Sequence, residues 1–196
     1  MPKGELIGEI VRLQVQRFPI KAKGSGYDPS GIQEVTKASV DAWGMVGWHE
    51  GAWIVDAHHK AHPARRGGGR RPLTIGFTAH YQAMADRFGT APLGIAGENL
   101  IVDGSTLTLA DLGEGLVIVA ADGTELLLER PRVAAPCLEF TSFMLGLDHV
   151  GSLDEIEGPL NDLHDGRRGF IVAADHASAP VELSVGDEVF HVTSGR

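Results

Sequence analysis

The residues of this chain best suited to chemistry lie at positions 129–138, where an arginine-rich segment ends in a Pro-Cys pair. Cys137 is the only cysteine of the chain, so it cannot form an internal disulfide and serves either packing or chemistry. Pro136 fixes the backbone immediately before the thiol. Arg130 and Arg132 lie close in sequence, and guanidinium charge favours the thiolate, the form that is both nucleophile and soft-metal ligand. Because free cysteines are usually buried and inert, both roles stay open at this point.

Several short motifs surround this cysteine in a defined order. Gly97-Glu98-Asn99-Leu100 is followed by a turn, paired strands and the arginine-rich segment that ends in Pro136-Cys137. Gly166-Arg167-Arg168-Gly169 then opens a strand, and Val185-Gly186-Asp187 precedes a closing strand. In the order and spacing of these motifs the chain resembles the MOSC domain, the C-terminal domain of molybdenum-cofactor sulfurases. The resemblance covers nearly the whole chain, and its most specific part is residues 97–189.

The resemblance implies a fold and an activity. The expected fold is a single domain over residues 1–196, mainly β, with a barrel of the MOSC or pyruvate-kinase-barrel-like kind and a few peripheral α-helices. The expected activity is reduction of N-hydroxylated or related N-oxygenated compounds with molybdenum cofactor, a molybdopterin. Cys137 would then be both the metal ligand and the catalytic residue, because thiolate is the soft donor that this metal requires. Pyridoxal phosphate is not expected on this chain.

The same resemblance assigns residues to the rest of the cofactor. The phosphate of a pterin cofactor requires cations, and Arg132, Arg167 and Arg168 are the candidates. Asn99 is a further candidate cofactor-binding residue, although it and Glu98 could equally brace the end of a strand. Arg168 has the strongest claim of the charged residues, because a glycine-flanked arginine entering a strand can be held facing a pocket.

Two departures from the family pattern keep other functions open. Residues 133–135 separate Arg132 from the Pro-Cys pair where the family usually has one residue, and Gly47-Trp48-His49 stands in place of a Gly-Asp turn. An altered pocket favours a second hypothesis, in which Cys137 carries a persulfide as a sulfur carrier or sulfurtransferase. The third is a non-enzymatic β-barrel that binds a small ligand. The expected partners are a small-molecule substrate or cofactor and a redox or sulfur-donor protein.

Length and composition exclude several classes of function. With 196 residues, of which 43% are hydrophobic, the chain is long enough for one domain with its own core. Its net charge of −9 argues against affinity for nucleic acid or an anionic membrane. No apolar run could span a bilayer, and residues 1–5 do not begin a signal peptide. One cysteine and no signal predict a reducing, cytoplasmic location.

Two polar groups of residues have both a simple and a functional interpretation. His58, His59 and His62 are dense enough to suggest zinc, but only Asp56 lies nearby as a further ligand, so a polar loop is the better interpretation. Residues 65–71, from Arg65 to Arg71, place four arginines around three glycines. Such a segment could wrap an anionic cofactor, or it could be a solvated loop.

Short alternating runs predict many strands, which favours a barrel or sandwich. Asp122-Gly123 is a hairpin signal between two of them, and residues 34–40 fit either a strand or a short helix. The predicted strands cover residues 6–15 and onward to 20, 73–75, 98–102, 116–121, 125–129, 170–174 and 188–192.

Helical spacing is clearest over residues 78–88, where Thr78 is the predicted cap and Gly89 the predicted end. Residues 138–165 are expected to form short helices and loops, and residues 21–31 a loop. The tryptophans are predicted to form a core cluster beneath a loop, because tryptophan is on average highly buried. They are Trp43, Trp48 and Trp53.

Overall fold

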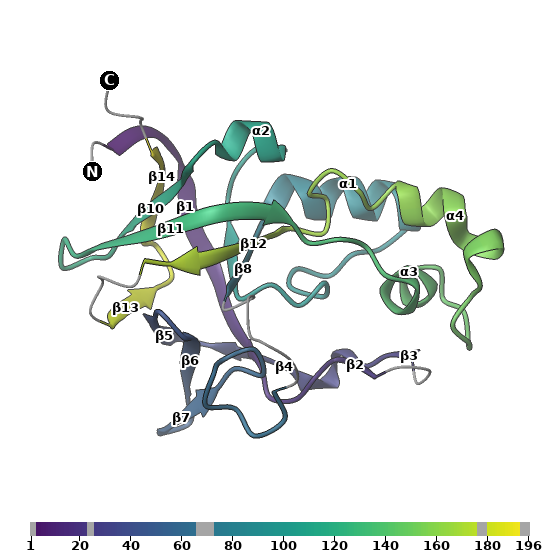
Figure 1. Cartoon of the computed structure of the whole chain (residues 1–196), viewed down its shortest axis with the longest axis horizontal. Coiled ribbons are helices and arrows are strands. Elements are labelled where there is room, and N and C mark those ends of the chain that lie inside the picture. Colours follow the sequence, from purple (N-terminus) through teal and green to yellow (C-terminus); the bar gives the residue numbers. More distant parts are fainter. Residues whose placement is uncertain (1–2, 23–25, 66–72, 176–179, 193–196) are drawn as a thin grey trace.

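The computed structural model describes residues 3–22, 26–65, 73–175 and 180–192 of the chain. Within these residues, seven strands pair in the order β14-β10-β11-β12-β8-β9-β1, and pairing of β1 with β14 closes them into a barrel (Figure 1). The predicted mainly β barrel with peripheral helices is confirmed. The barrel strands are β1 (Lys3–Gln16), β8 (Leu73–Phe77), β9 (Leu100–Val102), β10 (Gly115–Val119), β11 (Glu125–Val133), β12 (Phe170–Ala174) and β14 (Glu188–Val192).

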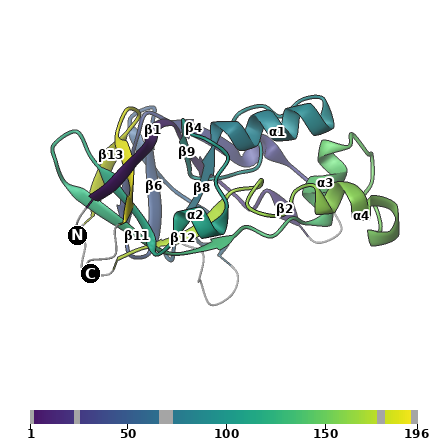
Figure 2. The same cartoon turned by 90° about the horizontal axis from the view of Figure 1, so that it is seen from above.

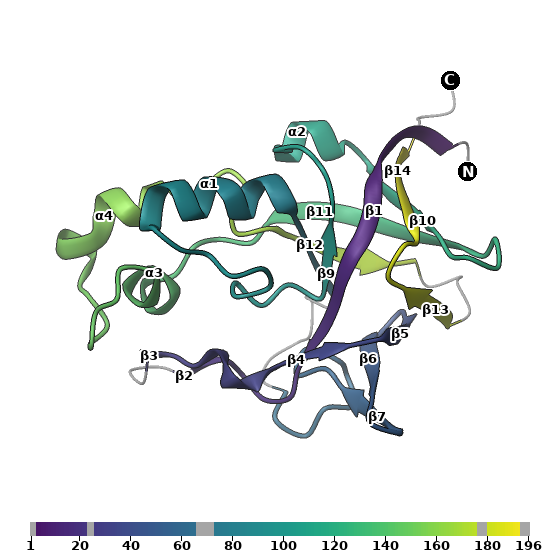
Figure 3. The same ribbon diagram turned by 180° about the vertical axis from the view of Figure 1, so that it is seen from behind.

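Strand β1 connects several parts of the structure because it is 14 residues long (Figure 3). Its first half pairs with β14, its centre with β9, and its last residues with β4 (Ile32–Val35). The barrel pairs are antiparallel except for β8 and β9, which run parallel. A parallel pair needs a crossover connection, and helix α1 (Thr78–Phe88) provides it.

A smaller sheet in the order β13-β5-β6-β7 lies below the barrel strands in Figure 1. Its inward residues, among them Val40, Met45 and Leu183, belong to the same buried cluster as the barrel residues, so the two sheets share one core. A short antiparallel pair, β2 (Lys21–Ala22) and β3 (Gly26–Tyr27), precedes a 3₁₀ turn, η1 (Pro29–Gly31). The strands of the small sheet are β5 (Lys37–Asp41), β6 (Gly44–His49), β7 (Ala52–Val55) and β13 (Val181–Ser184).

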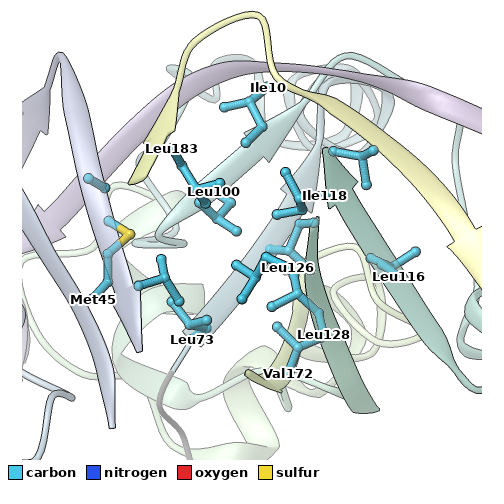
Figure 4. Packing of buried hydrophobic residues seen from close by; sticks show 14 of the residues in the cluster. Ile10, Met45, Leu73, Leu100, Leu116, Ile118, Leu126, Leu128, Val172 and Leu183 are labelled. Carbon is cyan, nitrogen blue, oxygen red and sulfur yellow. The ribbon is translucent and has the colours of Figure 1, made fainter. Parts of the chain in front are cut away.

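Large aliphatic side chains fill the barrel (Figure 4). On the β10–β11 hairpin, Leu116 lies opposite Leu128 and Ile118 lies opposite Leu126, and all four side chains are fully buried. Burying one such side chain stabilises a fold by about 1.5–3 kcal/mol. The apolar residues whose alternation with polar ones predicts these strands are therefore the residues that stabilise the barrel core.

Helices gather at one end of the molecule (Figure 2), where α1, α3 (Leu138–Met144) and α4 (Leu153–Asn161) lie together. A second buried cluster, which includes Tyr81, Met84 and Phe140, packs between α1 and α3. The helix predicted at residues 78–88 and the mixed helix and loop at 138–165 are confirmed. The short helix α2 (Leu109–Leu112) precedes β10. None of the helices in the described ranges has the length and apolarity needed to cross a membrane.

Some local predictions are wrong. Strand β1 ends at Gln16 and does not continue to residue 20, a stretch that includes Pro19, which has no N–H to donate to a sheet. Residues 21–31 are not a plain loop, since β2, β3 and η1 occupy most of them. Thr78 does not cap α1: Phe77 is the N-cap residue, and the Thr78 hydroxyl donates instead to Asp103 Oδ1 at 2.7 Å.

The predicted tryptophan core is also wrong. Trp43 and Trp53 are 46% and 42% exposed, and Trp48 is half-buried. Trp48 and Trp53 are cross-strand partners on β6 and β7, with ring centroids 5.3 Å apart. The Lys37 ammonium lies 5.4 Å from both rings, and that of Lys60 lies 3.5 Å from the Trp43 ring. The tryptophan rings are therefore covered by each other and by lysine side chains instead of being buried in the core, which is possible because the indole is amphipathic.

Gly8 is required where β1 passes β9. An added Cβ would lie 1.7 Å from the Asp103 carbonyl oxygen, which is backbone and cannot rotate away. We expect Gly8→Ala to lower the free energy of unfolding, measured in urea, by roughly 1–3 kcal/mol, the usual cost of overpacking. Gly158→Ala is the control, because a Cβ there meets open space, and in helix α4 it should leave stability unchanged or raise it. A Gly8→Ala protein as stable as the unmodified protein would contradict this role of Gly8.

Candidate functional site

A pocket of about 590 Å³ is formed by segments that are far apart in sequence. They include the end of β1, the turn after β7, strand β8, residues 96–98, Arg132, and residues 134–135. The pocket is rich in positive charge, which favours an anionic ligand. Its charged and titratable lining residues are Lys21, His58, Arg65, Glu98, Arg132 and Arg168. Of the arginine-rich loop at residues 65–71, only Arg65 lies within the described residues.

Cys137 lies beside this pocket and is partly exposed. It is the residue immediately before α3, in extended conformation. Its Sγ is 3.6 Å from Arg168 Nη1 and 3.7 Å from Lys21 Nζ. Both contacts place a positive charge beside the sulfur, an arrangement that would stabilise an anionic sulfur.

Arg168 is buried, with only 8% of its surface exposed. Its Nη1 donates to the Ala135 carbonyl oxygen at 3.1 Å, and its guanidinium carbon lies 4.9 Å from the centre of the Phe140 ring. The buried Nε has no hydrogen-bond partner among the described residues. Since buried N–H groups nearly always have a partner, this Nε is a donor suited to a ligand in the pocket. Arg168 lines the pocket, a position that a glycine-flanked arginine entering a strand can take.

The structure separates the other predicted site residues. Arg132 lines the pocket on β11. Arg167 is exposed, is not a lining residue, and donates to the Asp162 carbonyl oxygen at 2.7 Å. Asn99 is buried behind the pocket, where its side chain accepts hydrogen bonds from Thr74 and donates to the Asp56 carboxylate. Cys137, Arg168 and Arg132 are therefore grouped around the pocket, and Arg167 and Asn99 lie outside its lining.

Glu98 contributes a buried carboxyl group to the pocket wall. Tyr81 Oη donates to its Oε2 at 2.5 Å, while Oε1 has no partner among the described residues. Gly76 and Gly169 leave room for this group, because a Cβ on either would lie 2.8 or 3.0 Å from Oε1. Burial raises the pKa of Glu98, and the Tyr81 hydrogen bond and the Arg168 charge offset only part of that effect.

Two further groups respond to the same surroundings. Much of the Lys21 side chain is exposed, yet partial burial of its ammonium, followed by repulsion from Arg168, lowers the Lys21 pKa. Burial raises the pKa of Tyr27, whose hydroxyl donates to the Ile95 carbonyl oxygen. Tyr27 is therefore neutral, whereas Lys21 can lose its proton more readily than an ordinary lysine.

Sequence analysis assigned no ligand role to Lys21, His58 or Glu98. Lys21 comes from a segment read as a loop, and it lies 116 positions from Cys137, so no local pattern could connect them. The sequence suggests that Glu98 braces the end of a strand, and its hydrogen bond from Tyr81 agrees in part with that role. The sequence signal available for His58 is Asp56, two residues earlier, in a spacing that also suits a zinc ligand.

The raised pKa of Glu98 makes stability depend on pH. Below the ordinary glutamate pKa of 4.5, the group is protonated in both the folded and the unfolded chain. As the pH rises above that value, the unfolded chain ionises first, so the folded state loses relative stability. We expect the stability advantage of Glu98→Gln over the unmodified protein to grow from pH 4.5 towards neutrality. Urea unfolding at several pH values measures it, with the exposed Glu157→Gln as control, and a constant difference contradicts the prediction.

Among known proteins, no family model and no curated protein matches this chain. Solved structures do match. The crystal structure of the YuaD protein from Bacillus subtilis aligns with a TM-score of 0.57 and 20% identity, covering 95% of this chain and 97% of that one. This chain has a fold similar to that of YuaD.

The crystal structure of a hypothetical protein is similar to the same degree, with a TM-score of 0.56, 16% identity, and coverage of 96% of this chain and 69% of that one. YiiM from Escherichia coli matches with a TM-score of 0.47 and 19% identity over 83% of this chain and 66% of that one. The similarity to YuaD and to the hypothetical protein extends over nearly all of the chain. It establishes the fold, and at these identities it assigns no activity.

Proposed function

We propose that this chain is a MOSC-domain protein that binds molybdenum cofactor through Cys137 and reduces N-hydroxylated or related N-oxygenated compounds. The observation that carries the proposal is the position of Cys137 Sγ, within 3.7 Å of both Arg168 and Lys21, beside a pocket lined by cations. The motif order across residues 97–189, which resembles that of MOSC domains, supports it independently of the pocket geometry.

The residues of the pocket fit such a cofactor. Cys137 offers a soft thiolate donor at a partly exposed position. Arg168 offers a buried Nε that lacks a partner in the described chain, which suits an anionic oxygen. Arg65 and Arg132 add positive charge along the same wall, and a guanidinium can hold a phosphate with two parallel hydrogen bonds. These residues would hold the phosphate end, and Cys137 the metal.

The protein's own contribution is to bind, orient and shield. When bound, the cofactor supplies the electron transfer that reductive cleavage of an N–O bond requires, because protein side chains cannot supply it. The Ala135 carbonyl and the Phe140 ring fix the Arg168 guanidinium, so that its remaining N–H groups keep one direction. Apolar side chains such as Ile20 and Ile171 line the pocket and reduce its access to water. A drier pocket strengthens each charge interaction within it.

A second candidate function is favoured by the same two cations. A persulfide on Cys137 would be anionic, and Arg168 and Lys21 would stabilise it as they would a thiolate. In that case the protein is a sulfur carrier or sulfurtransferase that passes sulfur to a cofactor or small metabolite. It would need no permanently bound molybdenum.

Elemental and sulfur analysis of one preparation separates these functions. The protein should be purified anaerobically from a host supplied with molybdenum, and both molybdenum and sulfane sulfur should be measured per chain. About one molybdenum per chain is the expected result, matching one Cys137 ligand per chain. Sulfane sulfur on Cys137 without metal selects the sulfur carrier. A preparation with neither, whose thiol reacts with alkylating agents only after unfolding, contradicts both and leaves a ligand-binding barrel.

A further inference from the structure

One hydrogen-bonded group at the pocket has no role in the function proposed above. Its centre is Asp56, which has no exposed surface. Asp56 Oδ2 accepts from the Gln16 backbone N–H at 2.7 Å and from Asn99 Nδ2 at 3.0 Å. Its Oδ1 accepts from the His58 backbone N–H at 2.8 Å. Several hydrogen bonds therefore hold both oxygens of this buried carboxylate in fixed positions, as a buried charge requires.

The fixed carboxylate determines how the His58 ring is presented. His58 Nδ1 is 3.0 Å from Asp56 Oδ1. An ionised carboxylate only accepts hydrogen bonds, so Nδ1 must carry the proton of this contact. The ring's other nitrogen, Nε2, is then the one left free to contact a ligand. His58 lines the pocket, and 35% of its side chain is exposed, so Nε2 is accessible to a ligand.

Asn99 completes the arrangement from behind. Its Oδ1 accepts from both the backbone N–H and the hydroxyl of Thr74, each at 3.1 Å. Because those two bonds identify the oxygen, the amide nitrogen must point to Asp56, as its contact with Oδ2 shows. A chain of hydrogen bonds thus runs from Asn99 on the β9 side through buried Asp56 to His58 at the pocket. A carboxylate that orients a histidine in this way is a recurrent device of acid–base catalysis.

We infer that His58 is a catalytic acid–base residue of this pocket, with Asp56 and Asn99 as the residues that position it. The inference takes its substrate class from the proposed function. When an N-hydroxylated substrate is reduced, its N–O bond breaks and two electrons come from an external donor such as a reduced viologen. The proton on His58 Nε2 passes to the departing oxygen, which leaves as water, and a solvent proton goes to the nitrogen. His58 then regains its proton from solvent.

The ring tautomer tests the positioning without any cofactor. Two-bond ¹H–¹⁵N correlation spectra of the unmodified protein should show the neutral His58 ring protonated on Nδ1. Asp56→Asn should weaken that preference. His149 is an internal control, since its Nδ1 is likewise 3.0 Å from a carboxylate, that of Asp148, but both side chains are exposed and neither lines this pocket. A neutral His58 ring protonated on Nε2 in the unmodified protein overturns the inference, whether or not the variant folds.

Turnover tests the catalytic role. With reduced viologen and an N-hydroxylated amidine, His58→Gln should lower kcat by about 10²–10⁴-fold, the usual contribution of a general acid, with KM and molybdenum content little changed. His149→Gln is the matched control and should leave both constants unchanged. A His58→Gln enzyme with more than half the activity per molybdenum overturns the catalytic role.

Failure of the proposed function would be distinguishable from failure of this inference. If the unmodified protein holds no molybdenum and reduces no such substrate, the proposed function is wrong, and inorganic phosphate becomes the probe. Phosphate should then shift the ¹⁵N signal of His58 Nε2 and not the signals of His149, which supports His58 as a ligand-facing group. Phosphate that occupies the pocket should also protect Arg168 from a guanidine-specific reagent. If the ¹⁵N signal of His58 Nε2 does not shift at phosphate concentrations that give this protection, the inference about His58 is overturned.

Discussion

Cys137→Ser is expected to lose nearly all bound molybdenum and to unfold at nearly the same temperature as the unmodified protein. Serine keeps the shape of cysteine but is a much poorer ligand for a soft metal, so less than about a tenth of the metal should remain. Cys137 is only partly buried and lies at the margin of the second core cluster. The change in stability should therefore stay within about 0.5 kcal/mol, as for most substitutions outside a core. Elemental analysis and thermal unfolding of the same samples measure both quantities.

Cys137→Ala is the companion variant, since it also removes the ligand but without adding a hydroxyl. Both variants should behave alike in metal content. A loss of several kcal/mol in stability with molybdenum retained would show that Cys137 is a packing residue. Loss of sulfane sulfur from a protein that never held metal would instead select the sulfur-carrier function.

Arg168→Ala should weaken retention of the cofactor by roughly 10- to 150-fold. That range corresponds to about 1.5–3 kcal/mol for a charge-assisted hydrogen bond lost from a protein–ligand contact. Arg168→Lys should restore only part of the loss, because an ammonium cannot reproduce the planar fork of a guanidinium. Retention is measured as molybdenum per chain after dialysis, and added salt should weaken it less than it would an exposed pair.

The neighbouring residue provides the control for this experiment. Arg167→Ala removes the same charge one position earlier, from a side chain that is exposed and bonded to the Asp162 carbonyl oxygen. It should retain the cofactor normally. Equal losses in the two variants would mean that net charge matters and not the geometry of Arg168. If neither variant loses cofactor, the anion site lies elsewhere on the pocket wall, and Arg65 is the next residue to replace.

The barrel was predictable because its strands carry their own signals. Residues 170–174 and 188–192 form strands at the predicted bounds, and the Asp122-Gly123 turn joins β10 to β11 as expected. Strands β5 to β7 lacked such signals. They are short, and glycine and tryptophan interrupt their pattern on a face that is half solvated. Local periodicity cannot identify a strand whose exposed side also carries large apolar residues.

The candidate site was predictable only where one segment carries it. Cys137 and Arg168 stand out within their own motifs, and the structure places them 3.6 Å apart. The sequence favours Arg168 over Arg167 only by its place next to Gly169, and the turn at Gly166–Gly169 leaves Arg168 buried and Arg167 exposed. Lys21 and His58 reach the pocket only through long-range packing of β2 and of the turn after β7. Contacts between residues so far apart in sequence produce no recognisable spacing pattern along the chain.

The pairing of β1 with β14 has a consequence for how the barrel forms. These two strands lie far apart along the chain, with Leu6 opposite Phe190 and Glu9 opposite Glu188. The barrel therefore cannot close before the β14 segment is present. Until then the first half of β1 exposes an unpaired edge, which is the condition that recruits chaperones and promotes misassociation. Folding should be slow, in keeping with contacts between distant positions.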